Sequence, residues 1–269
     1  MLKVNHCHSG LSGKVTASVQ SREKATGSGS LPVPLSLCLA VCLALACSLA
    51  DAAAMPSPPQ AKAFGKTYAN YAQLWLQWAM AIPAASNPLL DPDGAYAAIG
   101  QTGKVWYLAG NFGGESVRSI TVPSGTALFF PIINAFWNNT PEYGDAPWSP
   151  EQEAFARAAV AGLVDTTTNP VLEIDGRSVS NLGDYRVASL AGSCKLPAQG
   201  NVLGVELDAA PHPCVADGYW ALLPPMSVGD HTVHFSGGFG SDFTLDVTYH
   251  ITVRPRQRVV DEGTSSLYP

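Results

Sequence analysis

The sequence predicts a mainly β fold: an antiparallel β-sandwich, jelly-roll or Ig-like, with two packed α-helices. Three observations support this prediction. After residue 100, most of the chain consists of short apolar runs separated by Gly and Pro, which is typical of strands and turns. Residues 243–253 alternate apolar and polar side chains, as a strand with one buried and one solvated face requires. Helical periodicity is confined to two segments, near 62–82 and 150–164.

The first 54 residues are typical of an export signal. Basic residues precede the apolar run 31–50, and small residues follow it up to Ala54, after which we expect cleavage. An uncleaved anchor helix is the alternative, because the run approaches the ~20 residues that span a bilayer. Lipidation at Cys47, or a bipartite leader to an organelle lumen, is also open. We therefore expect a secreted, periplasmic or cell-envelope protein with no stable membrane span after cleavage.

Composition bounds what the mature chain can be. Of the 269 residues 46% are hydrophobic, which is enough for a packed core and excludes wholesale disorder. The leader carries four basic and two acidic residues, so its removal changes the formal charge from −6 to −8. An acidic chain of this kind is not expected to bind nucleic acid. We expect one domain over 55–253 and a polar tail over 254–269.

Two cysteines, Cys194 and Cys214, remain once the leader is removed with its four others. In an exported protein such a pair is expected to form a disulfide bond. A zinc site that also uses His212 is the weaker alternative, because the chain has no paired Cys-x-x-Cys spacing.

The segment near 62–82 is predicted to be a helix with one aromatic face. Its large apolar residues recur at spacings of four and three, which places them on one side. These residues are Phe64, Tyr68, Tyr71, Trp75, Trp78 and Ile82. Polar side chains are expected on the opposite side, namely Lys66, Asn70, Gln73 and Gln77. Such a stripe is typical of a helix docked on a core.

The segment near 150–164 carries a helix start signal. Ser149 is a good N-cap, Pro150 suits the first helical position, and Gln152 stands where a capping box needs it. The buried stripe that we expect on this helix consists of Phe155, Ala158, Ala159, Gly162 and Leu163.

The remaining apolar runs are predicted strands. They are 105–109, 117–122, 126–133, 171–174, 177–179, 185–190, 202–207, 218–223, 231–236 and 243–253. Asp175-Gly176 indicates a two-residue hairpin turn, because these residue types tolerate the positive φ that both positions need. Asp91, followed by Pro, Asp and Gly, indicates another tight turn rather than a calcium loop.

Three segments carry a family resemblance. They are the Trp75-x-x-Trp78 helix, GQTGKVWYLAG at 100–110 and VPSGTALFFPIIN at 122–134. Through them the chain resembles a family of secreted, mostly bacterial signal-peptide proteins. The resemblance extends over most of the mature chain and implies export and a β-rich fold. It brings no activity with it.

The segment 134–148 is the predicted functional loop. It follows the most apolar strand, has no pattern of its own, and is too aromatic to be typical of disorder. Aromatic faces beside short amides suit sugar rings, which offer C–H faces and hydroxyl edges. The candidate ligand-binding residues in this segment are Asn134, Trp137, Asn138, Asn139, Tyr143 and Trp148. A structural loop whose rings plug the end of the sandwich is the alternative.

Three further residues are candidates for chemistry. Glu142 and Asp145 could be a catalytic acid/base pair of the kind that glycosidases use. Arg118 could bind a carboxylate or phosphate of a ligand, or form an internal ion pair.

No metal or other cofactor is expected. His231 and His234 would point to opposite faces of a strand, and the chain has no nucleophile elbow, zinc-protease motif, phosphate loop or dinucleotide fingerprint. The favoured hypothesis is an exported β-sandwich protein that binds a glycan or another small polar ligand through 134–148. The alternatives are a secreted, carboxylate-dependent glycan hydrolase or lyase, and a structural envelope protein that assembles through its aromatic helix.

Overall fold

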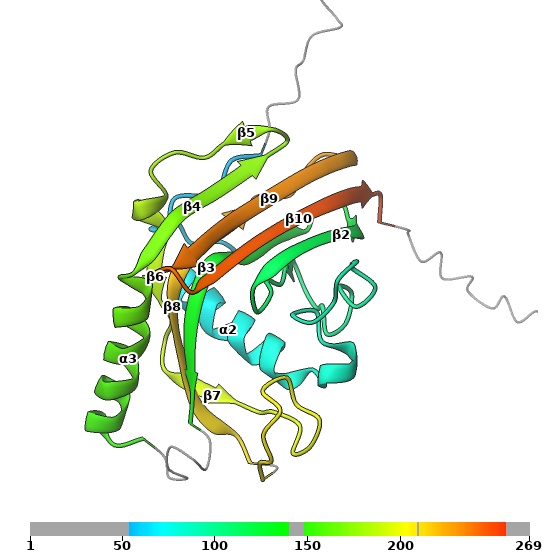
Figure 1. Ribbon diagram of the computed structural model, residues 1–269. Coiled ribbons are helices and arrows are strands. Elements are labelled where there is room, and N and C mark those ends of the chain that lie inside the picture. The colour runs from blue at the N-terminus through cyan, green and yellow to red at the C-terminus, as the bar shows by residue number, and fades with distance from the viewer. Residues whose placement is uncertain (1–53, 140–147, 209, 257–269) are drawn as a thin grey trace, which may run out of the picture. The chain divides into compact units, whose positions relative to one another are not determined.

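The computed structural model describes residues 54–139, 148–208 and 210–256 (Figure 1). The predicted leader lies outside these residues except for Ala54, as does most of the predicted tail, so both stay predictions. Within the described residues, no helix combines the length and the apolar character that crossing a membrane requires.

Two five-stranded sheets form the body of the fold, which confirms the predicted mainly β class. The first sheet has the order β1 (Val105–Tyr107), β3 (Ala127–Asn138), β8 (His212–Leu223) and β6 (Arg186–Ala188), with β7 (Gly192–Cys194) also paired to β8. The second has the order β2 (Gly114–Pro123), β10 (Phe243–Arg254), β9 (Gly229–Phe239), β4 (Thr167–Ile174) and β5 (Arg177–Ser178).

Each sheet also contains one parallel pair, which the strand patterns did not indicate. β1 runs parallel to β3, and β2 runs parallel to β10 along its whole length, from Gly114 beside Leu245 to Pro123 beside Arg254. Short hairpin turns force neighbouring strands to be antiparallel. β2 and β10 are far apart in the chain, so no hairpin turn imposes an antiparallel orientation on this pair.

The core between the sheets explains the strand patterns. Phe130 of β3 stacks on Phe235 of β9 with 5.1 Å between ring centroids, which brings the two inner faces together. Along β10 the apolar side chains are buried in this core and the residues between them are more exposed, as the alternation predicted. The Asp175-Gly176 turn is also confirmed, since both residues have positive φ, 51° and 73°.

The observed strands depart from the predicted ranges at several places, and two of these departures have a clear local cause. β3 continues to Asn138 rather than ending at Ile133, because Asn134–Asn138 still pair with β8. The predicted strand at 202–207 is absent from the structure. Its backbone is instead organised by Asn201, whose amide donates to the carbonyls of Pro197 and Val205 and accepts from the Leu203 N–H. A side chain that bonds the backbone in this way competes with a strand ladder.

The first helix, α2 (Tyr68–Ala81), packs on the outer face of the first sheet (Figure 1). Its predicted aromatic stripe is buried there, and Trp75 meets Trp220 of β8 edge-to-face at 5.5 Å. Two expectations were wrong. Phe64 precedes the helix, which starts after a Thr67 capping box, and is 47% exposed. Gln73, expected on a solvated face, is buried.

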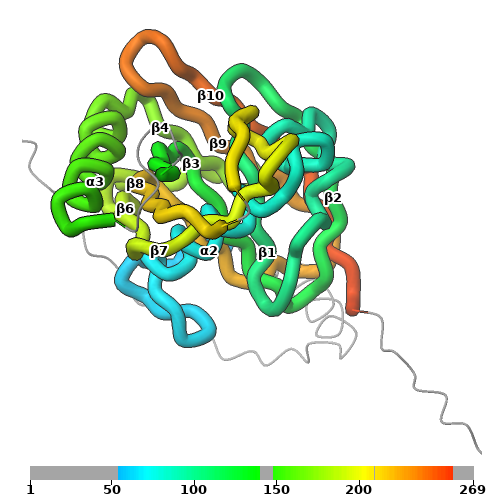
Figure 2. The backbone as a smooth tube through the Cα atoms, turned by 90° about the horizontal axis from the view of Figure 1, so that it is seen from below, coloured from blue at the N-terminus to red at the C-terminus, as the bar shows by residue number. Residues whose placement is uncertain are grey.

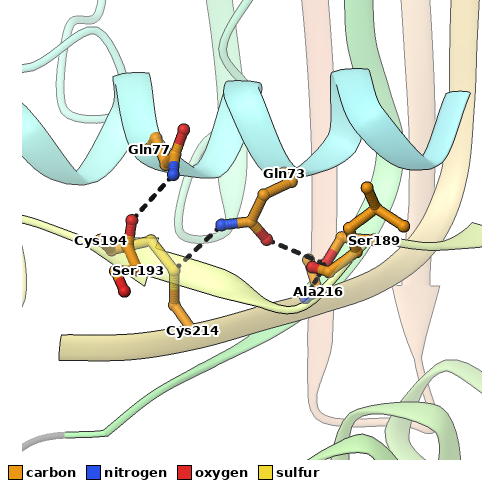
Figure 3. The surroundings of a disulfide bond; sticks show 8 residues. Gln73, Gln77, Ser189, Ser193, Cys194, Cys214 and Ala216 are labelled. Carbon is orange, nitrogen blue, oxygen red and sulfur yellow. Dashed lines mark hydrogen bonds between the residues drawn. A yellow bond between two sulfur atoms is a disulfide. The ribbon is translucent and has the colours of Figure 1, made fainter. Parts of the chain in front are cut away.

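Gln73 is buried because it contacts the disulfide strands (Figure 3). Its Nε2 donates to Cys214 Sγ at 3.3 Å, and its Oε1 accepts from the Ser189 hydroxyl. Cys194 and Cys214 form the predicted disulfide bond, which joins β7 to β8 with 5.8 Å between Cα atoms. One turn along α2, Gln77 donates to the carbonyl of Ser193 beside this bond. The disulfide therefore anchors the helix as well as the strands.

The second helix, α3 (Pro150–Val164), has the predicted start, with a complete Ser149–Gln152 capping box. Its predicted buried stripe was wrong. Ala156, Val160 and Val164 face the core, whereas Phe155 and Leu163 are 65% and 46% exposed. Small and β-branched residues spaced by four let the helix lie close to β3 and β8. In both views α3 lies on the side away from β2 (Figure 2).

A long connection leads from α2 to β1. It holds the 3-10 helix η1 (Ala84–Ser86); a second one, η3 (Leu182–Tyr185), precedes β6. The Asp91 turn in this connection has the predicted form, because Asp91 Oδ1 accepts from the N–H groups of Asp93 and Gly94 and Oδ2 accepts from Tyr96 at 2.7 Å. Burial alone would raise the pKa of Asp91, but these N–H donors outweigh it and hold the pKa below its usual value.

This turn predicts an acid-sensitive contribution to stability. Because the folded-state pKa of Asp91 is lowered, its contribution is complete above the unfolded-state pKa of about 3.9 and is lost as the pH falls through the folded-state value. We expect Asp91→Asn to lower the free energy of unfolding by about 2 kcal/mol at pH 7. Urea unfolding at pH 7 and at lower pH should show the gap to wild type closing on acidification. A gap that stays constant would contradict this role.

Candidate functional site

The predicted functional segment is divided between a strand and a helix start. Asn134, Trp137 and Asn138 belong to β3, so the prediction that a loop begins at Asn134 was wrong; Asn139 directly follows the strand. Trp148 immediately precedes the Ser149 cap of α3. Glu142, Tyr143 and Asp145 lie outside the described residues, so their roles stay predictions.

A surface pocket of about 260 Å³ lies where β3 ends and α3 begins. Trp137, Asn139 and Trp148 line it, together with three residues from the first turns of α3: Glu151, Gln152 and Phe155. We call this the aromatic pocket. Three of the predicted ligand-binding residues therefore meet around one opening.

The geometry of the aromatic pocket follows from local structure. Trp137 packs partly against the core between the sheets and meets the Phe155 ring edge-to-face, at 5.6 Å and 88°. The capping box fixes the first turn of α3, because the Gln152 N–H donates to Ser149 Oγ and Gln152 Oε1 accepts from the Ser149 N–H. β3 thus holds Trp137 and the capped helix holds Phe155, while Trp148 lies directly before the cap.

The Glu151 carboxylate gives the aromatic pocket a negative charge. Interaction with the Ser149 hydroxyl, followed by that with its own backbone N–H, holds the pKa of Glu151 below its usual value. The N-terminal end of α3 also favours an anion here. Glu151 is therefore an ionised acceptor at neutral pH. A general acid requires a raised pKa, so Glu151 is not suited to that role.

Asn134 and Asn138 do not join the aromatic pocket. Successive strand residues point to opposite faces, so Asn138 lies on the other face from Trp137, beside Cys214 in the register. Its side chain is buried, and neither amide atom has a hydrogen-bond partner among the described residues. Asn134 lines a different pocket, between β3 and the β9–β10 hairpin.

Arg118 also lies elsewhere, in the interior of the fold. It is 1% exposed, and Nε donates to the carbonyl of Asp91 at 2.7 Å. Nη1 donates to the carbonyls of Ala109 and Gly110 and to the Tyr249 hydroxyl. These hydrogen bonds are to neutral partners within the protein, so the structure gives Arg118 a structural environment rather than a surface one.

The two strand histidines have separate carboxylate partners. His231 Nδ1 lies 2.8 Å from Asp175, and His234 Nε2 lies 3.0 Å from Asp246. In the part of the chain that the structure describes, no group of three His, Cys, Asp or Glu residues is placed to hold a metal ion.

Comparison with family models, with curated proteins and with solved structures gives no match to this chain. The site must therefore be interpreted from its own geometry. Sequence reasoning missed Glu151, Gln152 and Phe155, because a capping box and an expected buried stripe explained them. For Phe155 the sequence did contain a signal. Ala156, Val160 and Val164 recur every four residues and form the buried side of α3, and Phe155 lies one position outside this series.

Proposed function

We propose that this protein binds a glycan at the aromatic pocket. The observation that carries the proposal is the arrangement of Trp137, Trp148 and Phe155 around an opening that also has amide and carboxylate groups at its edge. Phe155 is 65% exposed, so its ring is accessible to a ligand.

The chemistry of the lining suits a sugar. Ring faces can contact the C–H faces of a pyranose, and such contacts bury apolar area without requiring a charge. The Gln152 Nε2, which the capping box does not use, can donate to a sugar hydroxyl, and the ionised Glu151 can accept hydrogen bonds from other hydroxyl groups. The volume of about 260 Å³ fits one sugar ring at a time rather than a long enclosed chain.

The test is a glycan array followed by titration of the best-bound glycan. We expect Trp137→Ala to weaken binding about tenfold, because it removes one of the aromatic contact surfaces. Trp106→Ala is the matched control: Trp106 also packs partly against the core between the sheets but lines other pockets. Absence of glycan binding by the wild type, or equal loss in both variants, would contradict the proposal.

The two alternatives have less support. An acid/base pair of Glu142 and Asp145 remains a prediction, which reducing-sugar and unsaturated-product assays on the Glu142→Gln/Asp145→Asn variant would test. Assembly through the aromatic helix is not favoured, because the stripe on α2 is buried against the first sheet.

A further inference from the structure

A second pocket opens beside the unpaired part of β3. β1 pairs with Ala127–Phe129 only, so beyond Phe129 the described residues give that edge of β3 no strand neighbour. The β9–β10 hairpin, the loop before β2 and the end of α3 surround this stretch and leave a space of about 390 Å³. This volume lies within the range of ligand-binding pockets, about 300–1,000 Å³. We call it the inter-sheet pocket.

The interior of the inter-sheet pocket is apolar. Its buried lining includes Trp75, Leu89, Ile133, Ala135, Phe239 and Leu245. At the opening, Phe112 and Leu163 are each 46% exposed. An apolar interior with exposed apolar side chains at its mouth favours a ligand that buries a hydrocarbon portion.

The polar groups around the inter-sheet pocket restrict the ligand further. The Asn111 amide already has partners within the protein: Nδ2 donates to the Gly114 carbonyl and the Ser116 hydroxyl, and Oδ1 accepts from the Gly113 N–H. Asp242 is the one charged residue among the described lining, and it is exposed. The half-buried Asn134 side chain makes no hydrogen bond or ion pair with another described residue, and it carries both a donor and an acceptor.

The position of Asn134 is fixed by an irregularity in the sheet. The register of β3 on β8 shifts between Pro131 and Ile133, and Asn134 then lies opposite Gly218. A Cβ on Gly218 would come within 2.5 Å of Asn134 Cβ, so the glycine is what lets the two strands approach here. β-Bulges that redirect a side chain are common next to binding sites.

We propose that the inter-sheet pocket binds an uncharged amphiphile with a single hydrocarbon chain and a hydroxyl head. The chain occupies the apolar interior, and the Asn134 amide bonds the hydroxyl. Asp242 disfavours an anionic head, and the described lining offers no cation to pair with one. This site is distinct from the aromatic pocket and does not depend on glycan binding.

Displacement of N-phenyl-1-naphthylamine, an uncharged fluorescent probe, tests the proposal. We expect saturable probe binding that 1-decanol competes away, with affinity rising about fourfold for each methylene from 1-hexanol until the pocket is full. Decanoate should compete at least tenfold more weakly than 1-decanol at neutral pH. Non-saturable probe binding, or decanoate competing as well as 1-decanol, would overturn the proposal.

Two variants locate the site. Ala135→Phe fills the interior and should reduce probe binding at least tenfold, with circular dichroism to check that the variant folds. Asp242→Lys alters an exposed residue, should retain the fold, and should improve decanoate binding about tenfold while leaving 1-decanol unchanged. Asp184→Lys is the matched control, since Asp184 is exposed in η3 and is not part of the described lining. If Asp242→Lys and Asp184→Lys behave alike, the site is not this pocket.

Discussion

Arg118→Met is expected to lower the free energy of unfolding by about 4 kcal/mol, the largest single effect that the structure predicts. The guanidinium is the described donor to the buried carbonyls of Asp91 and Gly110, whereas Ala109 keeps the Tyr249 hydroxyl as a second donor. A buried acceptor left without a donor costs about 1–3 kcal/mol, and methionine restores neither bond.

Urea unfolding of wild type, Arg118→Met and Arg177→Met measures this effect. Arg177 is exposed in β5, so the free energy of unfolding of Arg177→Met should stay within about 0.5 kcal/mol of the wild-type value. The free energy of unfolding of Arg118→Lys should lie between the values for wild type and Arg118→Met. Lysine keeps the positive charge, but its ammonium group lacks the planar guanidinium geometry that bonds several carbonyls at once. If Arg118→Met were as stable as wild type, the cost of burying the cation would cancel its hydrogen bonds.

Removal of the disulfide bond should have the next largest effect. In the chain-entropy model, a cross-link between cysteines 20 residues apart contributes about 3 kcal/mol by restricting the unfolded chain. The Cys194→Ala/Cys214→Ala variant also removes the sulfur that accepts from Gln73 and so loosens α2. We therefore expect a loss of at least about 3 kcal/mol.

Reduction provides an internal control for the disulfide. A reducing agent should lower the unfolding midpoint of the wild type toward that of the double variant and leave the double variant unchanged. Ser193→Ala, which keeps the carbonyl that Gln77 uses, should behave like wild type in both conditions. A double variant with the stability of the oxidised wild type would show that native contacts alone hold β7 on β8.

Sequence periodicity predicted the elements that bury a single face. The strict alternation in β10 and the aromatic spacing in α2 each reflect one continuous buried face, so periodicity identified them. α3 differs because apolar residues occur on more than one of its sides. Which side is buried depends on how closely the helix approaches β3 and β8, and that distance is a tertiary property.

The candidate site was predicted in part for a similar reason. Trp137, Asn139 and Trp148 are close in sequence and meet in space, so composition could group them. Arg118 could not be assigned, because its partners come from the Asp91 turn, from the residues before β2 and from β10. The inter-sheet pocket was missed altogether, since it is lined by α2, β3, α3 and the β9–β10 hairpin.

The parallel pairing of β2 with β10 has a consequence for how the protein matures. One of the first strands to emerge during synthesis finds its partner only when residues 245–254 have been made. Until then the second sheet lacks a central strand, and contacts of such long sequence separation form slowly. The second sheet is therefore completed only after nearly all of the described residues have been synthesised.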